Sequence, residues 1–209
     1  MMKFLSIIFR GFSFLYPYTL HQRITEWKNT LYTLWIRNFV GQLGEHSRIC
    51  YPCSLQGGGQ KNITIGDYTT IQGASILGCW TKYGNQEFPN VSITIGNNCS
   101  IGEYNHITAC NKISIGNGLL TGRYVIISDN SHGGLSEKES FIEPAIRNLI
   151  SKGEVVIGNN VWLGDKVAVV SGVHIGNNVI VAANAVVTKD LPDDCMAAGV
   201  PAKVVKLLK

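Results

Sequence analysis

Residues 157–187 read IGNNVWLGDKVAVVSGVHIGNNVIVAANAVV, and every sixth position of this stretch, counted from its first residue, is aliphatic. The six positions are Ile157, Leu163, Val169, Ile175, Val181 and Val187. A period of six fits neither an α-helix, which repeats about every 3.6 residues, nor an alternating strand, which repeats about every 2 residues. It is typical of a solenoid in which each flat face takes one hexapeptide and three faces complete a coil. The stretch therefore predicts an all-β solenoid, a parallel β-helix.

The same six-residue spacing, called the grid below, continues through the preceding part of the chain. Its aliphatic positions, expected to point inward, include Ile65, Ile71, Ile95, Ile101, Ile107, Ile115 and Ile127, with Thr121 on the same spacing. The residue two before is small or β-branched at Thr69, Cys99, Val125, Val161, Val167, Val173, Val179 and Ala185. Five coils open with Ile-Gly-Asn or Ile-Gly-Asp, at Ile65, Ile95, Ile115, Ile157 and Ile175. Glycine, asparagine and aspartate tolerate the sharp dihedral angles that we expect at such corners.

Two excursions interrupt the repeat. A plain coil takes eighteen residues, the spacing from Ile157 to Ile175, whereas Ile65 to Ile95 and Ile115 to Ile157 are longer. The extra residues predict loops near 78–92 and 130–153, and such insertions often form the binding face of a repeat protein. The chain is therefore divided into an N-terminal helical segment, 1–45, a β-helix, 46–192, and a C-terminal tail, 193–209.

Composition limits the classes of partner and compartment. A net charge of +4 over 209 residues suits a small anionic ligand better than a nucleic acid. The six cysteines are scattered, and Cys50-Tyr-Pro-Cys53 has the spacing of a redox motif without a thioredoxin-like βαβ pattern around it. Reduced thiols in a cytoplasmic protein are the preferred interpretation.

The N-terminus predicts two helices. Residues from Phe4 to Tyr16 are mostly apolar, but Arg10 interrupts them, and the run is too short to span a bilayer. Pro17 should end this helix, and a second is expected from about Leu20 to Phe39 with one apolar face. We prefer a helical pair packed on the solenoid or on a neighbouring subunit. Peripheral membrane contact through residues 1–40 is the alternative.

His132 stands out among the candidate catalytic residues. It lies where a coil ends and the longer excursion departs, and Gly133 and Gly134 let the chain turn away there. A histidine exchanges a proton near neutral pH, because its ordinary pKa is about 6.5. An ordinary surface histidine is the alternative, but the place of His132 on the grid favours a catalytic one.

The chain resembles the hexapeptide-repeat acyltransferases over about Ile49 to Lys206. Its nearest branch resembles the galactoside, maltose and xenobiotic acetyltransferases and the related surface-polysaccharide O-acetyltransferases. Besides the hexapeptides, the motifs that carry the resemblance are Ser131-His-Gly133, Val161-Trp-Leu-Gly164, Val187-Thr-Lys-Asp190 and Ala198-Gly-Val-Pro-Ala-Lys203. The resemblance implies a left-handed coil and a homotrimer with its sites between adjacent subunits.

It also implies roles for individual residues. His132 would be the general base that deprotonates an acceptor hydroxyl, which then attacks the thioester of acetyl-CoA directly. The positions implied to contact CoA are Trp162, Gly164, Ala183, Thr188, Lys189, Lys203 and Lys206. Asp165 replaces the serine that supplies an oxyanion donor in several relatives, so a backbone N–H near Gly164 is the substitute. No metal is expected.

The acceptor side departs from the galactoside branch, which has an Ala-Asn pair one coil below the histidine. Glu103 and Asn105 are the nearby polar substitutes, Asn130 adjoins the base, and Trp80 suits stacking on a sugar ring. The long second excursion is closer to the surface-polysaccharide branch. We therefore expect an O-acetyltransferase of polysaccharide biosynthesis that takes a CoA thioester and a sugar acceptor.

Other functions stay open on the same fold. An amine acceptor would make the protein a sugar N-acetyltransferase, and serine is another acceptor. A carbonic anhydrase-like zinc enzyme would need three histidines, and only His132 and His174, on equivalent corners, are candidates, with His106 on a different corner. A non-catalytic solenoid is the last alternative.

Overall fold

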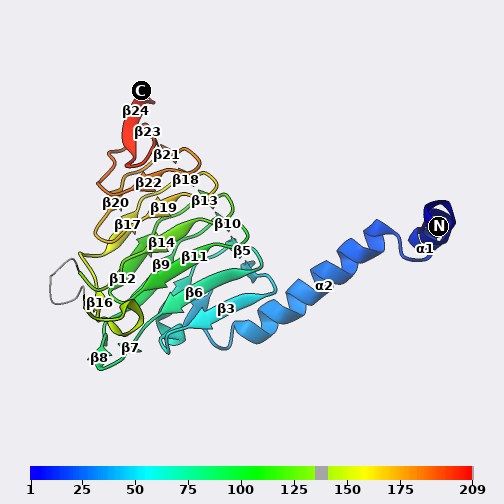
Figure 1. Ribbon diagram of the computed structural model, residues 1–209, viewed down its shortest axis with the longest axis horizontal. Coiled ribbons are helices and arrows are strands. Elements are labelled where there is room, and N and C mark those ends of the chain that lie inside the picture. Colours follow the sequence, from blue (N-terminus) through cyan, green and yellow to red (C-terminus); the bar gives the residue numbers. More distant parts are fainter. Residues whose placement is uncertain (135–140, 209) are drawn as a thin grey trace.

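The computed structural model describes residues 1–134 and 141–208, and its strands cycle through three sheets in chain order (Figure 1). The first sheet contains β1 (Gln42–Leu43), β4 (Ile63–Ile65), β9 (Ser92–Ile95), β12 (Lys112–Ile115), β17 (Val155–Ile157) and β20 (His174–Ile175). The second contains β2 (Arg48–Ile49), β5 (Thr70–Ile71), β10 (Ser100–Ile101), β13 (Leu120–Thr121), β18 (Trp162–Leu163), β21 (Ile180–Val181), β23 (Cys195–Ala198) and β24 (Lys203–Leu207). The third contains β3 (Cys53–Gln56), β6 (Ser75–Cys79), β11 (His106–Ala109), β14 (Ile126–Ser128), β19 (Ala168–Val169) and β22 (Val186–Val187).

Each turn of the coil stacks in register on the one before it. Ile65 pairs with Ile95, Ile95 with Ile115, Ile115 with Ile157 and Ile157 with Ile175, all in parallel. The antiparallel β24, which returns along β23, is the exception within the second sheet. The predicted parallel strands and N-terminal helical segment are therefore confirmed.

The residues at the six-residue spacing of the grid form the interior of the coil. The aliphatic grid positions are buried, and so are the small or β-branched residues two before them, such as Cys99, Val125 and Ala185. One continuous core therefore runs along the coil, because every turn covers the apolar interior of the next.

The corners after the first sheet are joined by a ladder of side chains. The Oδ1 atom of Asn117 accepts the backbone N–H of Asn97 at 2.8 Å, and Asn159 accepts that of Asn117 at 2.8 Å. Asn177 does the same for Asn159, and Asp193 for Asn177. The asparagine of each Ile-Gly-Asn corner therefore satisfies a backbone donor of the preceding turn.

The glycines of these corners serve a different purpose from the one expected. A Cβ atom at Gly66 would lie 2.3 Å from Oδ1 of Asn97, and one at Gly96 would lie 2.6 Å from the backbone of Gly116. Positive φ angles occur two residues later, for example at Asn98 (56°) and Asn160 (55°). The corner glycine is thus required by the close approach of the next turn, and the asparagine after it tolerates the left-handed backbone.

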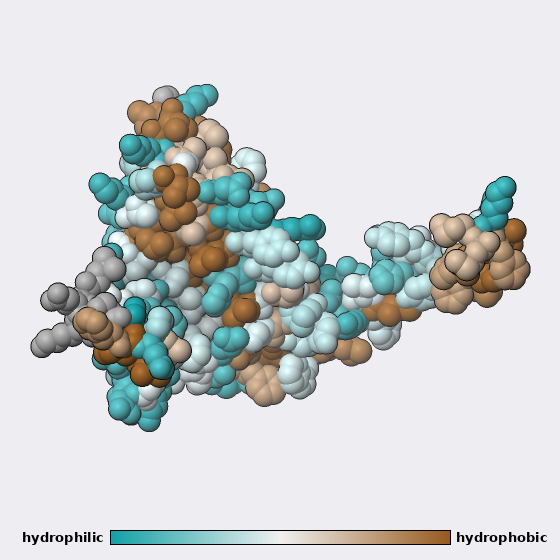
Figure 2. All heavy atoms as spheres, viewed as in Figure 1, coloured by the Kyte–Doolittle hydropathy of each residue, from teal (hydrophilic) through white to brown (hydrophobic). Residues whose placement is uncertain are grey.

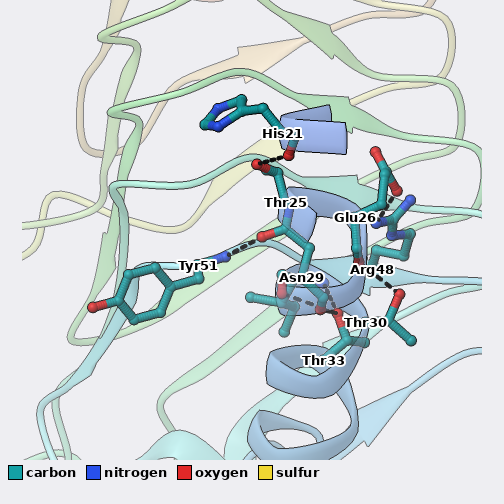
Figure 3. A network of polar contacts seen from close by, with 9 residues as sticks. His21, Thr25, Glu26, Asn29, Thr30, Thr33, Arg48 and Tyr51 are labelled. Carbon is teal, nitrogen blue, oxygen red and sulfur yellow. Dashed lines mark hydrogen bonds and ion pairs between the residues drawn. The ribbon is translucent and has the colours of Figure 1, made fainter. Parts of the chain in front are cut away.

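Helix α2 (Tyr18–Ile36) caps the first turn of the coil with its C-terminal half (Figure 3). Thr33 and Ile36 are buried, and the Thr33 hydroxyl donates to Ile49 O at 3.0 Å and accepts from Ile49 N at 3.2 Å. Asn29 accepts the N–H of Tyr51 at 3.1 Å. Side chains of α2 therefore satisfy backbone groups of the edge strands, which would otherwise be open to pairing.

Helix α1 (Met2–Leu15) lies beyond the far end of α2, away from the coil (Figure 1). Every residue of α1 is exposed, so the expected packing of this helix on the solenoid does not occur within the described part of the chain. Pro17 lies between the two helices. Among the described residues, no helix is long and apolar enough to cross a membrane.

The excursions add two antiparallel pairs beside the coil. The first contains β7 (Lys82–Tyr83) and β8 (Gln86–Glu87), and the second contains β15 (Ser131–His132), the short helix η2 (Pro144–Ile146) and β16 (Leu149–Ile150). A further short helix, η1, spans Gln60–Asn62. Residues 135–140 of the predicted second excursion lie outside the described residues.

Candidate active site

A hollow of about 250 Å³ lies beside the third sheet, where the two excursions meet. Its lining includes residues of β3, β11 and β14 and residues of both excursions. These residues are Gln56, Trp80, Tyr83, His106, Thr108, Ile126, Ser128, Asn130, Ser131, His132 and Leu149. The structure therefore brings His132, Trp80 and Asn130 of the predicted site together.

The backbone around His132 is fixed by strand pairing. His132 lies opposite Leu149 in the β15–β16 pair, and Gly133 N donates to Asn148 O at 2.8 Å. Gly133 has a φ of 76°, and a Cβ atom there would lie 2.7 Å from Cδ of Arg147. Glycine therefore allows the chain to turn under the Arg147 side chain directly after the histidine.

Tyr83 contacts the imidazole of His132. The hydroxyl oxygen lies 3.3 Å from Nδ1, and the rings meet edge to face with centroids 5.3 Å apart. The same hydroxyl donates its single proton to Ala145 O at 2.5 Å. It can then only accept from Nδ1–H, so Nδ1 carries a proton, and in the neutral imidazole the unprotonated nitrogen is Nε2. That tautomer is the one that a general base needs.

Gln86 ties the first excursion to the second. Its amide nitrogen donates to Leu149 O at 3.1 Å, and its amide oxygen accepts the N–H of Leu149 at 2.6 Å. Leu149 is the residue opposite His132 in the strand pair. The aromatic excursion therefore supports the backbone of His132 as well as its side chain.

Asp129 anchors the start of the longer excursion inside the protein. Its side chain is fully buried, and its two oxygens accept the backbone N–H groups of Cys110 at 2.8 Å and Asn111 at 2.9 Å. Its carbonyl accepts the Ser171 hydroxyl at 2.7 Å. Asp129 was not among the predicted site residues, although the sequence places an aspartate three residues before the histidine.

His106 also lines the hollow, within the same chain as His132. It lies on β11, directly beneath β14 in the third sheet, whereas His174 lies on β20 of the first sheet, so these two histidines are on different faces of the coil as expected. Burial lowers its pKa from the ordinary value, because desolvation disfavours the charged imidazolium. The lowered pKa favours the neutral form of His106 in the lining of the hollow.

Trp80 and Asn130 border the hollow from opposite excursions. The Trp80 indole N–H donates to the Thr108 hydroxyl at 3.2 Å, which fixes the ring. Asn130 donates to Thr108 O at 3.3 Å and to Asp129 Oδ1 at 3.1 Å. A half-buried, oriented aromatic ring next to polar groups is an arrangement that suits the face of a sugar.

A separate groove of about 410 Å³ lies along the second sheet. Three of the predicted CoA contacts, Trp162, Gly164 and Ala183, line it together with Met196. The substitute oxyanion donor is not available at Gly164 itself, because its N–H donates to Val181 O at 2.8 Å. Asp165 instead accepts the N–H of Arg123 at 2.8 Å, in the manner of the corner asparagines.

The predicted lysines lie near this groove and at another corner. Lys206 pairs with Met196 of the groove, and Lys203 pairs with Ala198 in the same antiparallel ribbon. Both lysines are exposed on β24. Thr188 and Lys189 follow β22 of the third sheet and are also exposed, so the seven predicted CoA contacts do not form one cluster in a single chain.

Two predicted acceptor contacts lie outside the hollow. Asn105 is buried, donates to the Thr121 hydroxyl and accepts the N–H of Val125 at 2.6 Å. Glu103 forms an ion pair with Arg123 at 3.2 Å beside a different hollow, which it lines together with Asp165. Asn105 therefore has a structural use, and we leave it out of the proposed acceptor contacts.

The zinc alternative gains no support from the histidines. His174 pairs with Val156 on the first sheet, while His132 pairs with Leu149 on the excursion. Among the described residues, no group of three His, Cys, Asp or Glu side chains is placed to hold a metal ion. All six cysteines are buried free thiols, including Cys50 and Cys53.

Residues 154–189 match the family described as "Bacterial transferase hexapeptide (six repeats)". This stretch of the chain is therefore similar to the hexapeptide repeats of that transferase family. The repeats of this family, together with its solved structures, imply the left-handed coil that the motifs predicted.

Curated relatives of this chain are acetyltransferases. WbbJ of Escherichia coli K12, named as a lipopolysaccharide biosynthesis O-acetyl transferase, is 39% identical over 118 residues, which are 54% of this chain and 60% of WbbJ. The galactoside O-acetyltransferase of the same organism is 35% identical over 99 residues, 45% of this chain and 43% of that enzyme. The chain thus spans less than two thirds of the length of either relative.

Solved hexapeptide-repeat structures share the architecture. The acetyltransferase VCA0836 of Vibrio cholerae aligns with a TM-score of 0.56 and 27% identity over 83% of this chain and 77% of its own. A second structure of VCA0836, from Vibrio cholerae O1 biovar eltor with acetyl coenzyme A, aligns with a TM-score of 0.53 and 25% identity over 83% of this chain and 74% of its own. The N-acyltransferase AntD of Bacillus cereus, with a TM-score of 0.66 over 84% of this chain and 89% of its own, shares the fold at 21% identity.

Proposed function

We propose that this protein is an acetyl-CoA-dependent O-acetyltransferase that acetylates a sugar hydroxyl of a surface polysaccharide or its precursor. The observation that carries the proposal is the contact between Tyr83 and His132, since it leaves Nε2 of the histidine free to accept a proton. The family and the names of the relatives favour acetyl transfer.

The reaction follows from a neutral histidine next to an acceptor hydroxyl. His132 takes the hydroxyl proton on Nε2 while the oxygen attacks the thioester carbonyl of acetyl-CoA. The tetrahedral intermediate then collapses, its carbon–sulfur bond breaks, and the imidazolium returns the proton to the departing thiolate. The products are an acetyl ester and free CoA, and no acyl-enzyme forms.

The donor site is assigned to the groove on the second sheet. Trp162, Gly164 and Ala183 line it and would contact the pantetheine arm. Lys203 and Lys206 are exposed on the neighbouring β24 and would pair with phosphates of CoA, as Lys189 and Thr188 would at their corner.

We propose that the protein assembles as a homotrimer, and the placement of the two sites on different sheets supports this. The groove belongs to the second sheet, whereas the hollow with His132 adjoins the third sheet. Base and thioester would meet if a second copy placed its groove beside the hollow of the first. A closed symmetric ring of copies fills every site in this way.

The acceptor is assigned to the hollow. Trp80 and Tyr83 offer aromatic surface for a sugar ring, and Asn130 offers an amide for its hydroxyls. The name of WbbJ favours a glycan of the cell surface. An amino sugar is the second candidate, because AntD, an N-acyltransferase, has the same fold and an amine can lose its proton to the same base. The buried free thiols favour a cytoplasmic location.

Release of free thiol from acetyl-CoA tests the proposal. The purified protein is incubated with acetyl-CoA and a panel of sugars, sugar nucleotides and lipid-linked glycan intermediates, and mass spectrometry identifies the product. Acceptor-dependent release with an acetyl ester in the product supports the proposal, and an acetamide product supports the second candidate. A protein that does not bind CoA in calorimetry would overturn both.

A further inference from the structure

Helix α1 presents an exposed apolar surface, and among the described residues the coil does not cover it. All its residues are exposed, including Phe4 (69%), Phe9 (65%), Phe12 (59%) and Phe14 (86%). Figure 2 shows this hydrophobic cluster at the end of the α2 arm, far from the coil. So much exposed aromatic surface on one helix indicates an interaction site.

The polar side of α1 is narrow and basic. At the helical spacing of about 100° per residue, Lys3, Ser6, Arg10 and Ser13 fall on one strip, and the large apolar residues fill the rest of the circumference. An apolar arc this wide exceeds the single stripe with which a helix packs against one partner helix. Such a helix suits insertion into the acyl boundary of a lipid bilayer, where its basic strip faces the water.

The charges of the arm, the part of the chain formed by α1 and α2, favour binding to an anionic surface. Residues 1–25 contain Lys3, Arg10 and Arg23 and no acidic residue. The nearest acidic residue, Glu26, forms an ion pair with Arg48 of the coil at 2.7 Å. The far end of the arm is therefore purely cationic.

The length and place of α1 exclude a spanning role. Its 14 residues would extend about 21 Å, which is short of the roughly 30 Å of a bilayer core. Asn29 and Thr33 hold the other end of the arm on the coil, and the break at Pro17 lets α1 take its own direction (Figure 1). A helix of this kind lies in the plane of the membrane interface.

We propose that α1 docks the protein on the surface of an anionic lipid bilayer, with its phenylalanines in the acyl boundary and Lys3 and Arg10 among the headgroups. This binding goes beyond the proposed acetyl transfer and does not depend on it. A second copy of the chain is the competing occupant of the same surface.

Vesicle flotation of the full-length protein tests the docking. The wild type should float with phosphatidylcholine vesicles that contain phosphatidylglycerol, and less with phosphatidylcholine alone. The double variant Phe4→Ser, Phe12→Ser should lower the binding constant at least ~10-fold, because both rings leave the acyl boundary. Lys3→Gln with Arg10→Gln should lower it about 30-fold on the anionic vesicles only.

The matched control is Ser6→Asn with Ser13→Asn, which changes the polar strip and should bind like the wild type. Light scattering in parallel measures the oligomer mass, which no α1 variant should change. Absence of wild-type flotation, equal loss in the control variant, or a smaller assembly in the Phe4→Ser, Phe12→Ser variant would each overturn the proposal, the last in favour of a second copy.

Discussion

The hydroxyl of Tyr83 has two hydrogen-bond partners, the carbonyl oxygen of Ala145 at 2.5 Å and Nδ1 of His132 at 3.3 Å. One hydroxyl has one proton to donate, and the shorter contact takes it. The imidazole consequently donates through Nδ1 and keeps a lone pair on Nε2. Tyr83 and His132 are 49 residues apart in the sequence and belong to different excursions. Their contact determines that Nδ1 of the imidazole carries a proton.

Replacing Tyr83 by Phe removes this contact while keeping an aromatic ring. Either tautomer of His132 then becomes accessible, so we expect kcat for acetyl transfer to fall about 10-fold, equivalent to roughly 1.4 kcal/mol, with KM for acetyl-CoA unchanged. Steady-state kinetics measure both. Tyr124→Phe, an exposed tyrosine that stacks on Tyr104, is the control and should behave like the wild type. Equal kinetics in the two variants would refute the role of Tyr83.

Gln86→Ala should loosen the strand that faces His132. The variant loses both hydrogen bonds to Leu149, each worth about 1 kcal/mol, so the Leu149 amide should exchange with deuterium at least ~5-fold faster. Hydrogen exchange followed by mass spectrometry of peptides that cover 146–150 reports this change. Gln22→Ala, on the exposed arm, is the control. Unchanged protection in the Gln86 variant would show that β16 is held by other contacts.

The asparagine ladder predicts which substitutions destabilise the coil. Asn159→Ala leaves the N–H of Asn117 without its acceptor and removes the contact to Asn177, which should lower the free energy of unfolding by about 1–3 kcal/mol. Urea denaturation followed by circular dichroism measures it. Asn85→Ala, in the exposed turn between β7 and β8, should cost under about 0.5 kcal/mol. The account of the corners fails if the two variants are equally stable.

The buried thiols predict a loss of stability at alkaline pH. Burial raises the pKa of Cys53 and of Cys110 to about 12, and that of Cys79 to about 11, with Asp129 adding to the shift at the last two. An unfolded cysteine has a pKa of about 8.5, so above that pH the unfolded chain binds fewer protons than the folded one.

The free energy of unfolding should therefore fall as the pH rises from about 8.5 towards 11. Urea titrations of the reduced protein at several pH values measure the slope. A Cys53→Ala, Cys79→Ala, Cys110→Ala variant should show a smaller slope, even if it is less stable throughout. An identical slope would mean that other groups cause the alkaline transition.

The fold was visible in the sequence because its determinants are local and periodic. Each sixth residue sees the same environment in every turn, so Ile157, Ile175 and their equivalents report burial without any knowledge of distant contacts. The corner glycines were recognised but misread. Their reason is the close approach of the next turn, which is distant in the sequence, and no local propensity contains that information.

The candidate site was only partly visible for the same reason. His132 was identified by its place at the end of a coil, whereas the contact with Tyr83 depends on how two loops fold over one sheet. The place of His106 in the same hollow was not predicted, because the grid says which residues point outward but not what covers them. Asn105 is a similar case, since its spacing does not distinguish a buried amide from an exposed one.

Acetyl-CoA turnover by wild type and His132→Ala, with an acceptor found in the panel, tests the central claim most directly. General-base catalysis contributes roughly 10²–10⁴-fold, so turnover should fall at least ~100-fold while calorimetric affinity for CoA stays the same. Turnover that survives the substitution would contradict the assignment of His132 as the base.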